Sequence, residues 1–230
     1  MDSTRAELDR WLHAAGHDLA EPARTIRSFL DLLERRHAAA LDAEAREYIG
    51  FATDAAARLE AMLAALLEYG RIGREPFAST PVDLAAVVER IETGLAPLLA
   101  ETGGRIEVGP LPPVAGDPKH WRRLMAILID NALAYRGSDP PVVEITSDSG
   151  RIMVADSGIG IEPRFHERVF EPFQRLHTRD AIPGCGMGLT IARRIAEHQH
   201  CRLDVELREG GGSVFTITLP RGQALSASVE

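Results

Sequence analysis

The sequence predicts an α+β protein, in which a two-helix hairpin is followed by an α/β sandwich. The first 70 residues are rich in good helix formers, and their apolar positions recur every three and four residues. The remaining residues alternate short β-rich runs with helical segments, which is typical of one sheet covered by helices on one side. The 230-residue length is enough for one large or two small domains.

The hairpin prediction rests on two apolar runs joined by a turn over residues 37–42, where Asp42 is a suitable N-cap with Glu44 in the first helical turn. Two antiparallel helices with one apolar stripe each cannot bury both stripes alone. We therefore expect two hairpins to pair as a four-helix bundle in a homodimer, although packing of the hairpin on its own second domain is an alternative. The first run is Leu8, Leu12, Ala15, Leu19, Pro22, Ile26, Phe29 and Leu33, and the second is Ala45, Tyr48, Ala52, Ala55, Leu59, Met62, Leu66 and Tyr69.

The second domain is expected after a glycine-containing linker at residues 70–76. Asp83 lies near the first turn of the helix that opens it. The predicted strands are 105–108, 142–146, 151–155, 203–207 and 213–219, and the predicted helices are 118–135, 163–175 and 187–199. The predicted domains are therefore a helical hairpin at 1–73, an α/β domain at 74–222 and a flexible tail at 223–230.

Composition excludes several classes of protein. A net charge of −8 does not indicate a nucleic-acid or membrane surface. Two cysteines, Cys185 and Cys201, form neither a disulfide framework nor a paired zinc motif, and free thiols favour a cytoplasmic location. No stretch approaches the roughly 20 apolar residues that span a membrane.

His17 lies between the stripe positions Ala15 and Leu19, so we expect it to point away from the bundle axis. Asp18 follows it, and Pro22 removes a backbone donor nearby, which predicts a bend in the helix. A neutral imidazole beside a carboxylate that orients it or takes its proton is a competent nucleophile. From these residues alone, an exposed surface histidine on a long helix is the better interpretation, and only the rest of the chain favours a nucleophile.

Two glycine-rich segments indicate a ligand site. The segment Asp156-Ser157-Gly158-Ile159-Gly160-Ile161 follows a predicted strand, and the Asp156 carboxylate suits an exocyclic amine such as adenine N6. Taken alone, however, the segment is better explained as a plain turn. Gly184-Cys185-Gly186-Met187-Gly188-Leu189 precedes a helix, and its backbone N–H groups suit phosphate. Asn131, in an apolar helix, is either a satisfied core amide or a ligand for Mg²⁺ and phosphate oxygens.

In order, His17, Asn131, Asp156, the segment 170–173 and Gly184 to Leu189 resemble the H, N, G1, F and G2 boxes of sensor histidine kinases, most closely the phytochrome-type kinases. The resemblance spans residues 10–220. It implies autophosphorylation of His17 from Mg²⁺–ATP, with Asp18 assisting, and transfer to an aspartate on a response-regulator receiver domain. It also implies a mobile lid at 164–183. The implied ATP-binding residues are Asn131, also the metal ligand, with Tyr135, Asp156, Gly158, Gly160, Ile161, Arg175, Gly184, Gly186, Met187, Gly188 and Leu189.

The chain departs from the family pattern in the N box, where Ile127 replaces an asparagine and Ala134 replaces a lysine. Arg136 is a nearby substitute for the lost cation. Glu21 stands where the family's phosphatase residue is threonine or asparagine, so little phosphatase action is expected. An active kinase, a slow kinase, a pseudokinase scaffold dimer and another ATPase of the same superfamily therefore all remain open.

Overall fold

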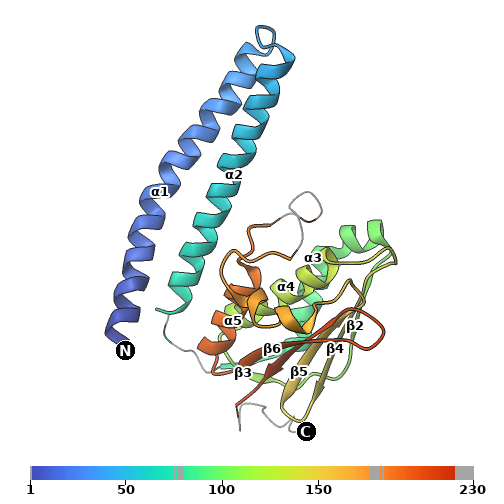
Figure 1. Ribbon diagram of the computed structural model, residues 1–230. Helices are drawn as coiled ribbons and strands as arrows, with labels where there is room; N and C mark the ends of the chain where they lie inside the picture. Colours follow the sequence, from blue (N-terminus) through green and yellow to red (C-terminus); the bar gives the residue numbers. More distant parts are fainter. Residues whose placement is uncertain (1, 75, 77–79, 177–181, 183, 221–230) are drawn as a thin grey trace. The chain divides into compact units, whose positions relative to one another are not determined.

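The computed structural model describes residues 2–74, 76, 80–176, 182 and 184–220, and it describes side chains from Leu19 onward. The chain separates into two compact units, Met1–Glu75 and Pro76–Glu230 (Figure 1). Each unit is described by itself below. The predicted tail at 223–230 lies outside the described residues. Within the described part of the chain, no helix is long and apolar enough to cross a membrane.

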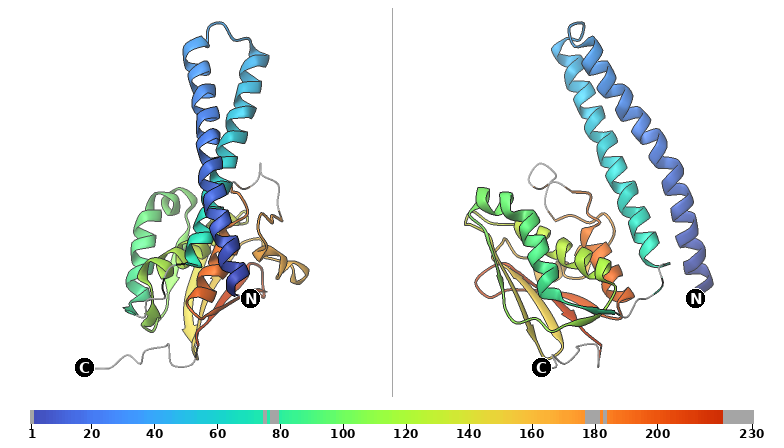
Figure 2. Two further views of the ribbon diagram at one scale, coloured as in Figure 1. Left: turned by 90° about the vertical axis from the view of Figure 1, so that its left-hand side faces the viewer. Right: turned by 180° about the vertical axis from the view of Figure 1, so that it is seen from behind.

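The first unit is the predicted hairpin of α1 (Asp2–His37) and α2 (Ala43–Ile72), which lie side by side in every view (Figures 1 and 2). The predicted N-cap of the second helix is confirmed, because Asp42 Oδ1 accepts a 2.7 Å hydrogen bond from the Ala45 N–H. Pro22 lies inside α1, which continues through it as a helix.

Several apolar side chains of the hairpin are not buried between its two helices. Ala23 and Ala56 are buried. By contrast, Leu19, Ile26 and Phe29 of α1 are exposed to 54%, 54% and 65%. These residues belong to the stripe that the sequence predicts to need a partner, and the packing of α1 against α2 leaves all three side chains exposed.

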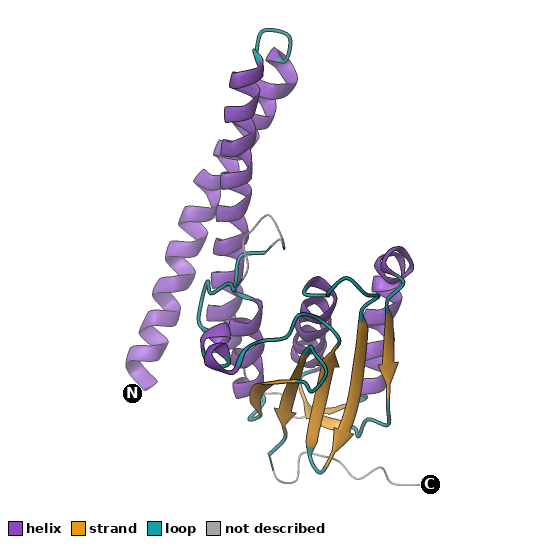
Figure 3. Ribbon diagram, turned by 45° about the vertical axis from the view of Figure 1, so that its right-hand side comes forward, coloured by secondary structure: helices purple, strands orange, loops and turns teal. Residues whose placement is uncertain are grey.

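The second unit contains a mixed sheet in the order β2-β4-β5-β7-β6, with β2 parallel to β4 and the other neighbours antiparallel. The strands are β2 (Arg105–Val108), β4 (Val142–Asp148), β5 (Arg151–Asp156), β6 (Arg202–Leu207) and β7 (Ser213–Thr218). The three helices described in this unit lie on one face of the sheet (Figure 3). The predicted α+β fold class is thus confirmed.

Those helices are α3 (Leu84–Thr102), α4 (Pro118–Ala134) and α5 (Gly188–His198). The core between helices and sheet is made of fully buried aliphatic and aromatic side chains. It includes Trp121, Leu124, Leu128, Ile145, Ile152, Ile191 and Ile195. Asp83 caps α3 by accepting from the Ala86 N–H at 3.1 Å, and Asp117 caps α4 from the Lys119 N–H at 2.7 Å. Local capping therefore sets where both helices begin.

The prediction of a helix at 163–175 is wrong. The segment forms two short 3-10 turns, η1 (Pro163–Phe165) and η2 (Arg168–Phe170), and then extended backbone at Glu171. Pro172 explains the ending, because a residue before proline is disfavoured in helical conformation. A small antiparallel pair, β1 (Thr80–Val82) and β3 (Val114–Gly116), was not predicted.

Candidate nucleotide site

Three segments that are distant in the sequence meet at the C-terminal half of α4. The loop after β5 joins α4 through the Ile159 N–H, which donates to the Tyr135 carbonyl at 3.1 Å. Tyr135 in turn donates to the Asn131 carbonyl at 2.9 Å. The start of α5 approaches the same helix, since a Cβ on Gly188 would lie 3.6 Å from Ile127 Cγ2. The structure therefore brings the predicted N, G1 and G2 segments together.

Asp156, the last residue of β5, is the buried carboxylate of this site, with 6% of its surface exposed. Its Oδ1 accepts from the Gly158 N–H at 2.8 Å and from the Ser213 N–H at 3.1 Å. Burial raises the pKa of the Asp156 carboxyl, and these two hydrogen bonds oppose the rise. Because both bonds use Oδ1, Oδ2 is left to accept from a ligand, and an adenine amine is a suitable donor.

The turn between β6 and β7 packs against Asp156. Arg208 donates to the Asp156 carbonyl at 3.3 Å and pairs with both carboxylate oxygens of Glu144 at 2.8 and 2.9 Å. The same turn presses against the loop after β5, because a Cβ on Gly160 would lie 2.9 Å from the Gly212 carbonyl oxygen. A two-bonded arginine–carboxylate pair thus holds the turn in register with β4 and β5.

Gly212 and Gly210 of this turn form a matched pair for substitution. Both have positive φ, 90° and 87°, but a Cβ at Gly212 would lie 2.0 Å from the Asp156 carbonyl oxygen, whereas one at Gly210 meets nothing within 4 Å. Gly210→Ala should lower the free energy of unfolding by about 1–2 kcal/mol, the cost of left-handed backbone for a residue with Cβ. Gly212→Ala adds a backbone clash, so we expect a loss of at least about 3 kcal/mol. Urea denaturation of both variants measures the difference, and equal losses would contradict the packing described here.

The G1 glycines are required by close approaches. A Cβ on Gly158 would lie 2.3 Å from the Tyr135 carbonyl oxygen, and Gly160 has a φ of +73°. Ile161 ends the loop, and its carbonyl is 2.9 Å from His166 Nε2, which fixes the start of the predicted lid. These contacts hold the backbone between Asp156 and the lid close to its neighbours. Such an arrangement leaves room for a flat ligand beside Asp156.

The predicted phosphate loop precedes α5 and contacts the F-box segment. Gly184 and Gly186 have φ values of +139° and +76°, and a Cβ on Gly186 would lie 2.8 Å from the Gln174 carbonyl oxygen. Arg175 donates to the carbonyls of Ile182 and Gly184. The predicted phosphate contact Arg175 is therefore bonded to the loop backbone in this structure.

The remaining two predicted residues of the loop differ in exposure. Met187 is 1% exposed and packs in the core, whereas Leu189 is half-buried. Thr190, in the first turn of α5, has a buried hydroxyl without a hydrogen-bond partner in the described residues. The sequence analysis did not select Thr190. The position of Thr190 directly after the glycine loop is the sequence feature that could have identified it.

Asn131 carries the observation that best fits a nucleotide. Its Nδ2 is buried and has no hydrogen-bond partner in the part of the chain that the structure describes. A buried unpaired donor is costly, so a phosphate oxygen is a fitting partner. The amide oxygen of the same side chain is a suitable ligand for Mg²⁺, which keeps several waters and needs few protein ligands. The residues present therefore fit Mg²⁺–ATP.

The atypical N-box residues lack such chemistry. Ile127 is 5% exposed and lies against the start of α5, so it contributes packing. Ala134 is exposed, and the Arg136 guanidinium donates to the Leu133 carbonyl at 3.2 Å. In this structure Arg136 is therefore directed to its own helix end.

The lid segment is anchored through Phe170, which is 4% exposed. The Arg193 guanidinium of α5 lies 3.8 Å from the centre of the Phe170 ring and pairs with Glu167 at 3.1 Å. Phe173 is 40% exposed and has a φ of +62°. The lid residues 177–181 and 183 lie outside the described residues.

His17 and Asp18 lie on α1, in the other unit. Their side chains are outside those that the structure describes. His200-Cys201 follows α5, and His200 has a left-handed φ of +59°. Cys201 is buried, and burial raises the pKa of its thiol to about 12.

Comparison with known proteins identifies the family of this chain. Residues 116–223 match the family model described as histidine kinase-, DNA gyrase B-, and HSP90-like ATPase. The phytochrome-like protein Cph1 of Synechocystis sp. is 34% identical over 226 residues, which are 96% of this chain and 30% of that protein. The chain belongs to the histidine kinase family. It is a kinase core most like those of phytochrome-type kinases, and it spans about 30% of the length of such relatives.

Solved histidine kinases share the fold of this kinase core. Full-length ShkA in complex with AMPPNP superposes with a TM-score of 0.67 at 24% identity, covering 90% of this chain and 45% of ShkA. Histidine kinase ThkA in complex with the response regulator TrrA gives a TM-score of 0.65 at 23% identity, covering 96% of this chain and 65% of that chain. At these identities the likeness concerns the fold.

Proposed function

We propose that this kinase core is an ATP-dependent protein-histidine kinase that phosphorylates His17 and passes the phosphoryl group to a response-regulator aspartate. The buried Nδ2 of Asn131, which has no hydrogen-bond partner among the described residues, carries the proposal. Asn131 lies in the part of α4 that the loop after β5 and the start of α5 both approach. ATP binds with its adenine at Asp156 and its phosphates between Asn131 and the glycines at 184, 186 and 188.

The transfer step is a direct displacement at the γ-phosphorus. A ring nitrogen of His17 supplies the electron pair of the new N–P bond. The bond between the γ-phosphorus and the β–γ bridging oxygen breaks, and ADP leaves with the electron pair of that broken bond. The ring proton passes to Asp18 or to water. Bound Mg²⁺ neutralises charge on the phosphates. The protein's part is mostly positioning and charge neutralisation, as expected for phosphoryl transfer.

The acting form is a homodimer. The exposed stripe of Leu19, Ile26 and Phe29 on α1 is an apolar surface that a second hairpin would bury in a four-helix bundle. The response regulator is the proposed partner by analogy with ThkA, whose solved complex contains one. We place the kinase core in the cytoplasm, where free thiols such as Cys185 persist.

Incubation of the chain with γ-labelled ATP and Mg²⁺ tests the proposal. We expect an acid-labile, alkali-stable phosphoprotein and transfer of the label to an added receiver domain. Absence of label from a chain that binds ATP in calorimetry would contradict the proposal.

The second candidate is a slow kinase or a pseudokinase dimer that serves as a scaffold, and Ile127 favours it. An apolar, 5% exposed side chain in the N box provides neither a metal ligand nor a proton acceptor. Ala134, in place of a lysine, adds the loss of one charged phosphate contact, which costs roughly a hundredfold in rate. Labelling that needs hours at saturating ATP would favour the slow kinase, and failure to bind millimolar ATP would favour the scaffold.

A further inference from the structure

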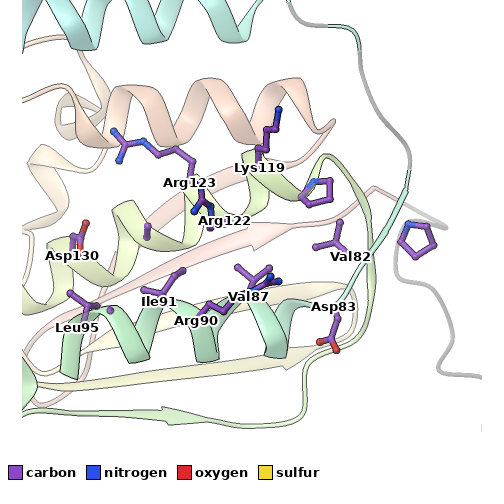
Figure 4. Close-up of a pocket in the computed structure, with 14 residues that line it drawn as sticks. Val82, Asp83, Val87, Arg90, Ile91, Leu95, Lys119, Arg122, Arg123 and Asp130 are labelled. Carbon is purple, nitrogen blue, oxygen red and sulfur yellow. The ribbon is translucent and has the colours of Figure 1, made fainter.

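A groove of ≈ 740 Å³ runs between α3 and α4, and it shares no residue with the nucleotide site (Figure 4). Its apolar lining on α3 comes from Val87, Ile91 and Leu95, which recur every four residues. Helix α4 forms the other wall from Pro118 to Asp130. The lining therefore follows both helices for about three turns, or roughly 18 Å. This length suits a short helix better than a compact small molecule.

The rim of the groove is basic in a chain whose net charge is −8. Figure 4 shows Arg90 on α3 and Arg122 on α4, on opposite walls. Arg90, Lys119 and Arg122 form no ion pair in the described residues. Arg90 Nε donates only to the Ala86 carbonyl of its own helix, at 3.2 Å. These three cations are therefore available to carboxylates of a partner.

Each of the two carboxylates that line the groove interacts with a group other than the three rim cations. Asp83 Oδ1 accepts the N-cap hydrogen bond of α3. Burial raises the pKa of the Asp130 carboxyl, and the neighbouring Arg123 cation opposes the rise. Neither carboxylate is paired with Arg90, Lys119 or Arg122, so the rim keeps its positive character.

Besides the basic rim, Gly94 is a feature of the groove that packing within the chain does not explain. It lies inside α3, where glycine is less favourable than alanine, and it lines the groove. A Cβ at Gly94 would meet nothing within 4 Å. A missing side chain at this point lowers the wall of the groove and permits close approach of another backbone.

We propose that the α3–α4 groove is a docking site for an acidic amphipathic helix of a partner protein. Leucine-type side chains of that helix would occupy the floor over Val87, Ile91 and Leu95, while its Asp and Glu side chains would meet Arg90, Lys119 and Arg122. The apolar floor distinguishes this occupant from a nucleic acid or a phosphate, which would use the cations alone. The proposal is independent of the kinase function.

The test is fluorescence polarisation with the full chain and a labelled 14-residue helical peptide with leucines on one face and glutamates beside them. We expect the peptide to bind, and a matched peptide with lysine in place of every glutamate not to bind. Arg122→Glu and Gly94→Trp should each weaken binding by roughly tenfold, the first by charge and the second by filling the groove. Arg151→Glu, at the exposed start of β5, is the control and should bind as wild type.

Any of three results in the direct binding measurements would overturn the docking site. They are absence of binding by the glutamate peptide, equal binding of the two peptides, and unchanged affinity in both groove variants. Full competition by a leucine-free polyglutamate peptide or by short single-stranded DNA would show a general anion surface, which also contradicts the proposal. Unchanged ATP affinity in Arg122→Glu and Gly94→Trp would show that both variants are folded.

Discussion

Replacing His17 by alanine is expected to abolish ATP-dependent labelling of the chain while leaving its affinity for ATP unchanged. The histidine supplies the nucleophile, and no step of nucleotide binding in the proposed site uses α1. His17→Gln should also incorporate no label, because glutamine keeps a polar side chain on the helix but has no nucleophilic ring nitrogen. The measurement is incorporation of labelled phosphate at saturating Mg²⁺–ATP, together with calorimetric titration of ATP.

His37→Ala is the matched control, since His37 lies in the last turn of the same helix and is exposed. It should incorporate as much label as the wild type. If His17→Ala and the wild type were labelled equally, another side chain would be the acceptor and the proposed role of His17 would be wrong.

The second large effect is expected for Asp156→Asn, which should weaken ATP binding by roughly 2–3 kcal/mol, or about 30–150-fold. The amide oxygen can still accept from the Gly158 and Ser213 N–H groups, which fixes the amide orientation. The amide nitrogen then stands where Oδ2 was, so that a donor faces the adenine amine. Calorimetry with ATP measures the loss, and Asp148→Asn at the exposed end of β4 is the control.

Stability separates this loss of binding from misfolding. Burial raises the pKa of the Asp156 carboxyl in the folded protein above its unfolded value. The folded state therefore holds this proton to higher pH than the unfolded state does. The contribution of Asp156 to the free energy of unfolding falls as the pH rises from the unfolded-state pKa through the folded-state pKa. At neutral pH, Asn removes this cost, so Asp156→Asn should unfold at the same or higher urea concentration than the wild type. Lower stability with proportionally lower ATP affinity would contradict the assigned role.

The features that the sequence predicted well depend on neighbouring residues. Asp42 was identified as a cap because its partner, Ala45, is three residues away. Strands such as 105–108 follow from local alternation. The glycine loops were predicted because close approach and positive φ both require glycine, as Gly160 shows.

The features that were missed or wrong depend on distant contacts or on backbone breaks. Arg208 and Glu144 meet although 64 residues separate them, and neither carries a local signal for that pairing. The segment 163–175 was predicted as one helix, but Pro172 forces extended backbone at Glu171 and only two short 3-10 turns form before it. The unpaired Nδ2 of Asn131 is visible only when the whole environment of the side chain is known.

The order of strands has a consequence for synthesis of the chain. β7 lies between β5 and β6, so β6 cannot join the sheet until β7, which is made after it, has been inserted. The Ser213 N–H that supports Asp156 belongs to β7. A nascent chain that already carries Asn131, Asp156 and all the glycines of the phosphate loop therefore still lacks a complete adenine pocket. We therefore expect nucleotide affinity to arise only after β7 (Ser213–Thr218) has been synthesised and inserted between β5 and β6.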